Sequence, residues 1–82
     1  MLKILFFAKL REDLDTAEVR LDYRPGQTVA DILACLCDRG EPWSQALGQD
    51  NLMIAVNQEM CDRQHGVCDG DEVAFFPPVT GG

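Results

Sequence analysis

Basic residues are scarce in this sequence. Its 82 residues contain 7 Lys and Arg against 14 Asp and Glu, which gives a formal net charge of -7. Proteins that bind nucleic acid neutralise phosphates with a basic face, and binding to anionic membranes needs basic clusters. The charge balance therefore argues against both nucleic acid and a membrane surface, and favours a protein that offers cationic groups as the partner.

Long apolar runs are also missing. No segment approaches the roughly 20 apolar residues that a membrane-spanning helix needs. The apolar start of the chain is interrupted by the charged residues Arg11, Glu12 and Asp13, without the small-residue cleavage site of a signal peptide. We therefore interpret the start as a strand and expect a cytoplasmic protein.

Histidine and paired metal ligands are equally limited. His65 is the only histidine and lies in a polar stretch, so no histidine-based nucleophilic site is predicted. The four cysteines, Cys35, Cys37, Cys61 and Cys68, form C-x-C and C-x6-C pairs, unlike the spacings of zinc or plant-type iron–sulfur sites. On a helix, Cys35 and Cys37 would point about 200° apart. We predict four reduced thiols and no metal; a metal or iron–sulfur module is the competing hypothesis.

The chain is long enough for one small domain with a modest core. Alternating, branched and aromatic residues indicate strands, and Ala17, Val19 and Leu21 are expected to face inward from the second of them. Residues 11–16 would connect the first two strands as a hairpin. The predicted strands cover residues 2–8, 17–22, 52–56, a short segment from 60 to 61, and 72–76.

Two helices are predicted between the second and third strands. Thr28 and Asp31 have the spacing of a reciprocal capping box, and Gly40 suits the residue just past the end of the helix. Between them, one apolar stripe recurs at helical spacing, formed by Val29, Ile32, Leu33 and Leu36. A short second helix starts near Pro42 and includes Trp43, which we expect to cover the core.

This order of elements predicts an α+β protein of two layers. By analogy we expect the β-grasp (ubiquitin-like) fold, with a mixed sheet of about five strands packed on one main helix plus a short second helix. Residues 1–76 would form this domain, and residues 77–82 an extended, flexible C-terminal tail.

A single layer of helices covers only one face of such a sheet. In a β-grasp sheet the first and last strands are adjacent, and their covered face would take Ile4, Phe6, Val73 and Phe75. Alternation then turns Leu5, Phe7, Ala74 and Phe76 outward. Phe7 and Phe76 would form an exposed apolar patch with Met60 at its margin, which is typical of a partner-binding site. The alternative is that loops or the short second helix cover these residues.

The last residues, Pro77-Pro78-Val79-Thr80-Gly81-Gly82, suggest a chemical role. Two prolines favour an extended exit from the sheet, and Gly81 and Gly82 lack side chains that would block a narrow channel. A carboxylate on Gly82 is inert until it is activated, for instance as an acyl adenylate. We therefore predict that another enzyme acts on this end of the chain.

These features resemble the molybdopterin synthase small subunits, a family of sulfur-carrier proteins. The resemblance is most specific in residues 69–82, DGDEVAFFPPVTGG, and extends to residues 3–8, to Arg11-Glu12 and to residues 55–58. Residues 13–50 match only in pattern. Ubiquitin-like modifiers commonly carry arginine before the Gly-Gly pair, and none is present here.

The resemblance implies a non-catalytic, sulfur-donating subunit without a permanently bound cofactor. An E1-like adenylyltransferase would use ATP to activate the carboxylate of Gly82, and a sulfur donor protein would convert it to a thiocarboxylate. The tail would then enter the large synthase subunit, within a heterotetramer, and donate sulfur to cyclic pyranopterin monophosphate to form the dithiolene of molybdopterin.

The resemblance also implies that Phe7, Arg11, Met60 and Phe76 contact partners, together with the tail residues Pro77, Pro78, Val79, Thr80 and Gly81. Three alternatives remain beside the metal module. The chain could be a thiazole-pathway sulfur carrier, a ubiquitin-like modifier joined to lysines through Gly82, or an interaction domain in which the Gly-Gly pair has no function.

Overall fold

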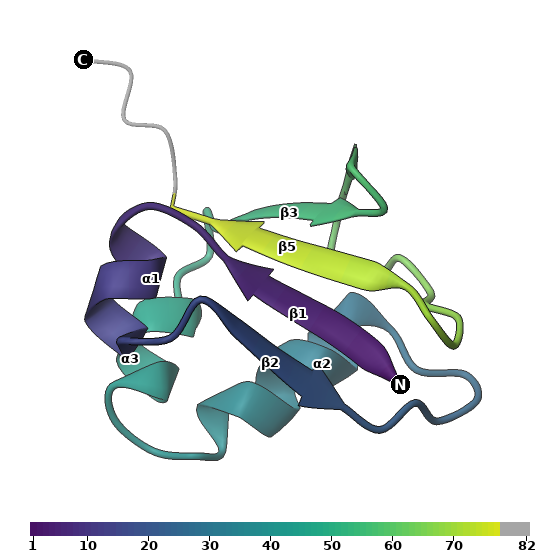
Figure 1. The fold of residues 1–82 in the computed structure, drawn as a ribbon, viewed down its shortest axis with the longest axis horizontal. Helices are drawn as coiled ribbons and strands as arrows, with labels where there is room; N and C mark the ends of the chain where they lie inside the picture. Colours follow the sequence, from purple (N-terminus) through teal and green to yellow (C-terminus); the bar gives the residue numbers. More distant parts are fainter. Residues whose placement is uncertain (78–82) are drawn as a thin grey trace.

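One mixed β-sheet with helices against one of its faces forms the protein (Figure 1). The structure is a computed structural model that describes residues 1–77, so the predicted tail residues Pro78, Val79, Thr80, Gly81 and Gly82 lie outside the described residues. The elements in chain order are β1 (Leu2–Phe6), α1 (Lys9–Leu14), β2 (Glu18–Leu21), α2 (Val29–Cys37), α3 (Trp43–Leu47), β3 (Met53–Val56), β4 (Glu59–Cys61) and β5 (Glu72–Phe76).

The strand order is β2-β1-β5-β3-β4, with β1 and β5 parallel and the other neighbours antiparallel. The two strands nearest the ends of the described chain therefore lie side by side in the middle of the sheet, as Figure 1 shows in purple and yellow. This arrangement, with α2 as the main helix and α3 as the short one, confirms the predicted α+β β-grasp fold.

Helix α2 begins as its sequence predicts. The backbone N–H of Asp31 donates to Oγ1 of Thr28 (3.4 Å), and the backbone N–H of Thr28 donates to Oδ2 of Asp31 (2.9 Å). Both bonds of the capping box are present, so two of the unpaired N–H groups at the helix start are satisfied. The apolar stripe of α2 is buried. Asp38 caps the C-terminal end, and Gly40 adopts its positive φ of 89° two residues beyond that cap.

Helix α1 (Lys9–Leu14) is a difference from the expected hairpin, in which residues 11–16 form only a connection. Leu10 and Leu14, four residues apart, are buried in the core, and this packing explains the helix. Ala8 (φ 54°) precedes it without any side-chain cap, and Asp15 (φ 51°) ends it in the left-handed region. Because the chain turns into α1, β1 ends at Phe6 rather than at residue 8.

Strand β2 is one residue shorter at each end than its prediction, which covered residues 17–22. Ala17, expected to face inward, is exposed because the regular strand begins only at Glu18. Val19 and Leu21 are half-buried and pack against the core, as predicted. Strand β3 begins at Met53, one residue later than expected, and β4 at Glu59, one residue earlier.

The core lies between the sheet and the helices. Ile4, Phe6, Val73 and Phe75 are all almost completely buried, which confirms the covered face predicted from alternation. Trp43 of α3 is half-buried and packs edge-to-face on Phe6, with the ring centroids 5.6 Å apart. The guanidinium of Arg39 lies over the Trp43 ring, 4.9 Å from its centroid. Trp43 therefore covers the core as expected.

Candidate functional site: the apolar end of the open face

The face of the sheet away from the helices carries side chains from alternate positions of its strands. In the register, Leu5 lies opposite Ala74, Ala74 opposite Ala55, and Ala55 opposite Met60, which makes one apolar row across four strands. A second row places Met53 opposite Phe76. We call Leu5, Phe7, Met53, Met60 and Phe76 the apolar end of the open face.

Phe7 and Phe76 form the centre of the apolar end. Their rings are stacked with centroids 4.8 Å apart and planes 10° from parallel. The backbone N–H of Phe7 donates to the carbonyl of Phe75 (3.2 Å), which fixes Phe7 beside β5 although β1 has ended. Phe7 is 38% exposed and Phe76 is half-buried, so within residues 1–77 neither loops nor α3 cover this pair. The predicted exposed patch is therefore present.

The neighbours of the aromatic pair complete the surface. Met60 is exposed at the margin, as predicted, and Leu5 is half-buried. Ala74 does face outward but is buried, since a methyl group between larger neighbours presents little area. Met53 was missed, although its position opposite Phe76 makes it part of the same surface.

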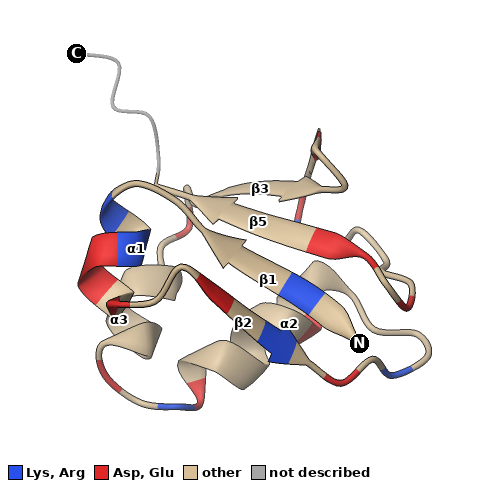
Figure 2. Cartoon of the chain, in the orientation of Figure 1, with Lys and Arg blue, Asp and Glu red and all other residues tan. Residues whose placement is uncertain are grey.

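The other end of the same face is charged. Lys3 of β1 lies between Arg20 of β2 and Glu72 of β5 in the register. Glu18 pairs with both cations, at 3.9 Å from Nζ of Lys3 and 3.3 Å from Nε of Arg20. Figure 2 shows a basic segment on β1 and an acidic segment on β5 toward the N-terminus, whereas the opposite ends of these two strands carry no charge. Along β1 and β5 the open face thus changes from charged to apolar, whereas on the edge strand β2 the charged Glu18 lies opposite Leu5. The apolar end lies where the chain leaves the sheet.

Arg11 lies on α1, which begins two residues after Phe7. Its side chain is exposed, and the helix is held at the edge of the apolar end by the bond from the N–H of Leu10 to the carbonyl of Phe7 (3.2 Å). Lys9 precedes it on the same helix, and Figure 2 shows basic residues on α1. The structure therefore brings Phe7, Arg11 and Phe76 into one region, with positive charge next to apolar surface.

The cysteines do not gather into a site. Within residues 1–77, no group of three or more His, Cys, Asp or Glu side chains could hold a metal ion. Cys35 and Cys68 are exposed. Burial raises the pKa of the half-buried Cys37 and Cys61 thiols; Arg63 partly opposes this for Cys37, and Asp62 adds to it for Cys61. A raised pKa keeps both thiols protonated and weakly nucleophilic at neutral pH.

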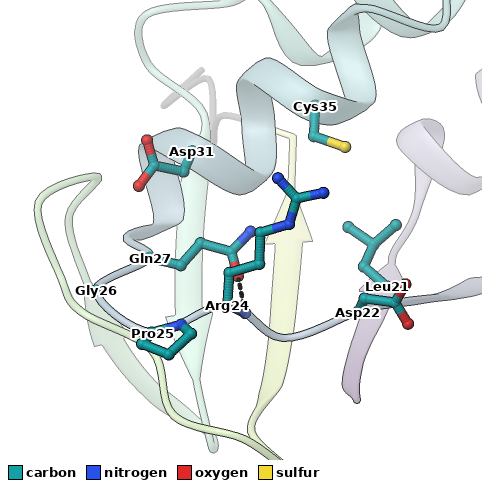
Figure 3. A pocket seen from close by; sticks show the side chains of 8 residues that line it. All are labelled: Leu21, Asp22, Arg24, Pro25, Gly26, Gln27, Asp31 and Cys35. Carbon is teal, nitrogen blue, oxygen red and sulfur yellow. Dashed lines mark hydrogen bonds between the residues drawn. The ribbon is translucent and has the colours of Figure 1, made fainter.

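A shallow cavity of about 530 Å³ lies between the end of β2, the loop that follows and the start of α2 (Figure 3). Asp22, Arg24, Asp31 and Cys35 are among its lining residues, and Gln27 is held there by a bond from the backbone N–H of Arg24 to its Oε1 (3.3 Å). The Asp31 carboxylate already serves the capping box of α2. The cavity shares no residue with the apolar end.

No helix among residues 1–77 combines the length and the apolar character that crossing a bilayer requires.

Comparison with known proteins places the chain in a family. Residues 4–82 match the ThiS family. Over the full length of both chains, the sequence is 45% identical to the molybdopterin synthase sulfur carrier subunit of Escherichia coli K12 and 40% identical to that of Haemophilus influenzae. The crystal structure of SAMP1 from Haloferax volcanii, a small archaeal modifier protein, is similar at a TM-score of 0.78 and 30% identity, over 99% of this chain and 98% of that one. The chain therefore belongs to the ThiS family and, within it, to the molybdopterin synthase sulfur carrier subunits.

Proposed function

We propose that the chain carries sulfur as a thiocarboxylate on Gly82 and delivers it to the large subunit of molybdopterin synthase in the cytoplasm. The observation that carries the proposal is the exposed Phe7–Phe76 stack at the point where the chain leaves the sheet. Aromatic residues are enriched among the dominant contacts of protein interfaces. An aromatic pair beside Pro77 fits a protein whose last residues enter a partner that the apolar end contacts.

The chemistry begins with activation of the carboxylate. An E1-like adenylyltransferase supplies ATP, a carboxylate oxygen of Gly82 attacks the α-phosphate, and pyrophosphate leaves. A sulfur donor protein then delivers sulfur at the sulfide level, which attacks the carbonyl carbon of the adenylate and displaces AMP. The product is a thiocarboxylate, with sulfur in place of one oxygen. Gly82 lies outside the described residues, so this step is supported by the sequence and by the family. Gly81 and Gly82 suit it because they have no side chain to obstruct the activating site.

Sulfur transfer takes place in the large subunit of the synthase. The large subunit holds cyclic pyranopterin monophosphate, and the thiocarboxylate sulfur becomes part of the dithiolene of molybdopterin. Two large subunits, each with one carrier, form the heterotetramer. The carrier contributes the reactive sulfur and a docking surface, made by the apolar end and Arg11, with the residues from Pro77 to Gly81 reaching into the partner. Its net charge of -7 favours approach to a site that must be basic to hold phosphates.

A second function has specific support. The similarity to SAMP1 favours a protein modifier that is joined to lysines through Gly82. Both functions begin with the same adenylate and differ in what attacks it, because a sulfur donor gives a thiocarboxylate and a lysine gives an amide.

The test is intact-mass measurement. We expect incubation with the cognate E1-like enzyme, ATP and a sulfur donor to raise the mass by the difference between sulfur and oxygen. Omission of ATP and deletion of Gly81-Gly82 are the matched controls, and neither should show the shift. An unchanged mass with an enzyme that charges its own carrier would refute the proposal. High-mass adducts that survive reductant would favour the modifier.

A further inference from the structure

All three methionines of the chain are exposed. Met1 and Met60 are each 59% exposed and Met53 is 36% exposed. This is unusual, because methionine commonly fills irregular gaps in cores. Here the buried hydrophobic residues of the described chain are Leu, Ile, Val, Phe and Ala. Two of the three methionines, Met53 and Met60, belong to the apolar end of the open face.

The register fixes where these two thioethers lie. Met53 of β3 is directly opposite Phe76 of β5, and Met60 of β4 is directly opposite Ala55. Met53 thus belongs to the row that contains Phe76 and its stack with Phe7, and Met60 belongs to the neighbouring row. Together they extend the apolar surface from the middle of the sheet to its β4 edge. Neither side chain lies on the covered face, where β3 presents Ile54 and Val56 to the core.

Methionine differs from leucine at such a position in its chemistry. A peroxide transfers one oxygen atom to the thioether sulfur, which is oxidised to a sulfoxide, while the peroxide is reduced to water or an alcohol. A sulfoxide reductase reverses the change, with its dithiol oxidised to a disulfide and the oxygen released as water. The side chain alternates between an apolar and a polar state without any change in the backbone.

We propose that Met53 and Met60 are a peroxide-sensitive modification site that controls docking of this carrier. Their sulfoxides place polar oxygens in a surface that must be desolvated against the large subunit, so oxidation releases the carrier and reduction restores it. The inference rests on the proposed function, because it requires that the apolar end contacts that subunit.

The fold tolerates the modification. Both sulfurs are on the open face, so a sulfoxide oxygen remains in water when the carrier is free and displaces no core residue. The cost arises only on binding, where an unsatisfied polar group is buried. Met1 provides an internal control, because it is as exposed as Met60 but precedes β1, at the charged end of the face.

The cysteines do not reproduce this effect. Cys35 lines the cavity beside α2, and Cys68 lies in the loop before β5, so neither exposed thiol belongs to the apolar end. Their reversible oxidation products are removed by dithiothreitol, which leaves methionine sulfoxide unchanged. Treatment with peroxide followed by dithiothreitol therefore isolates the methionines.

The experiment uses the full chain and its cognate large subunit. The carrier is treated with hydrogen peroxide and then dithiothreitol, peptide masses assign the sulfoxides, and calorimetry measures Kd for the large subunit. We expect carrier with sulfoxide at residues 53 and 60 to bind about tenfold more weakly, the factor that a buried unsatisfied polar group produces. Methionine sulfoxide reductases should restore the original Kd. A double variant, Met53→Leu with Met60→Leu, retains Met1 as its only methionine and should show the same Kd before and after treatment.

The outcomes separate the two proposals. If untreated carrier does not bind the large subunit, the proposed docking fails and the inference fails with it. If untreated carrier binds and sulfoxide at both residues leaves Kd unchanged, only the inference is overturned. It is also overturned if the double variant loses affinity on treatment, since Met1 or a thiol is then responsible. Circular dichroism of the oxidised carrier must match that of the untreated carrier, and a lost fold would contradict the placement of both sulfurs outside the core.

Discussion

The two faces of the central strands carry the same kinds of residues in different roles. Phe75 and Phe76 are consecutive in β5, yet Phe75 is completely buried under the helices and Phe76 is half-buried in the open face. Phe75 packs against Phe6 of β1 on the covered side. Phe76 packs against Phe7, the residue after β1, on the open side. Hydrophobicity alone does not distinguish a residue that holds the domain together from one that is available to a partner. The face of the sheet to which the side chain points makes this distinction.

The largest expected effect is on the free energy of unfolding, when the buried ring of Phe75 is removed. Phe75→Ala should lower the free energy of unfolding by about 3–5 kcal/mol, because it removes a buried aromatic ring and leaves a cavity. Phe76→Ala is the matched control, and its loss of roughly 1 kcal/mol reflects the aromatic contact with Phe7. Chemical denaturation followed by the fluorescence of Trp43, the only tryptophan, measures both. Equal losses would mean that the two faces do not differ as described.

Binding to the large subunit should depend on the apolar end of the open face and not on its charged end. Phe7→Ala, at the centre of the apolar end, should weaken binding to the large subunit by about 2 kcal/mol or more, which is roughly thirtyfold in Kd. Arg20→Ala removes an exposed side chain at the charged end of the same face and should change Kd little. Calorimetry with the purified subunit measures both. Greater loss from Arg20→Ala would relocate the interface to the charged end.

A third change weakens the covering layer without touching either face. Thr28→Ala removes the side-chain oxygen that accepts from the N–H of Asp31, and should lower the free energy of unfolding by about 1 kcal/mol. Thr28→Ser keeps a hydroxyl and should recover most of the loss. Denaturation curves measure stability, and Kd for the large subunit should be unchanged in both variants. A changed Kd would show that α2 contributes to docking.

The smallest expected effect concerns thiol reactivity. At neutral pH, Cys37 and Cys61 should react with iodoacetamide more slowly than Cys35 and Cys68. Burial raises the pKa of the first pair, so the reactive thiolate is less populated at a given pH. Raising the pH through those pKa values should increase the rates of Cys37 and Cys61. Peptide masses over time give each rate, and equally fast labelling of all four would contradict the half-buried positions.

Local backbone rules explain what the sequence predicted well. Alternation in β1 and β5 assigned both faces correctly, because a strand turns successive side chains to opposite sides whatever its partners are. The capping box of Thr28 and Asp31 located the start of α2, since its two bonds join residues only three apart. The apolar end was predicted in its aromatic part for the same reason.

Tertiary packing decided what the sequence left unresolved. Helix α1 has six residues and no side-chain cap, so Leu10 and Leu14 gave the only local signal, and the core stabilises the rest. Met53 joined the apolar end through the β3–β5 register, which no single strand reveals. The role of Arg11 rests on family resemblance, and the start of α1 two residues after Phe7 was not predicted from the sequence.

The central position of β5 affects the order in which parts of the protein unfold locally. β5 is hydrogen-bonded on both sides, to β1 and to β3, whereas β2 and β4 are the edges of the sheet. Local openings start at edges and ends, so slow hydrogen exchange should concentrate in β5 and be lost only on global unfolding. The residues after Pro77 are thus attached to the most persistent part of the molecule. Even when the edge strands open, the strand that leads into the proposed sulfur-carrying tail stays in register with the apolar end.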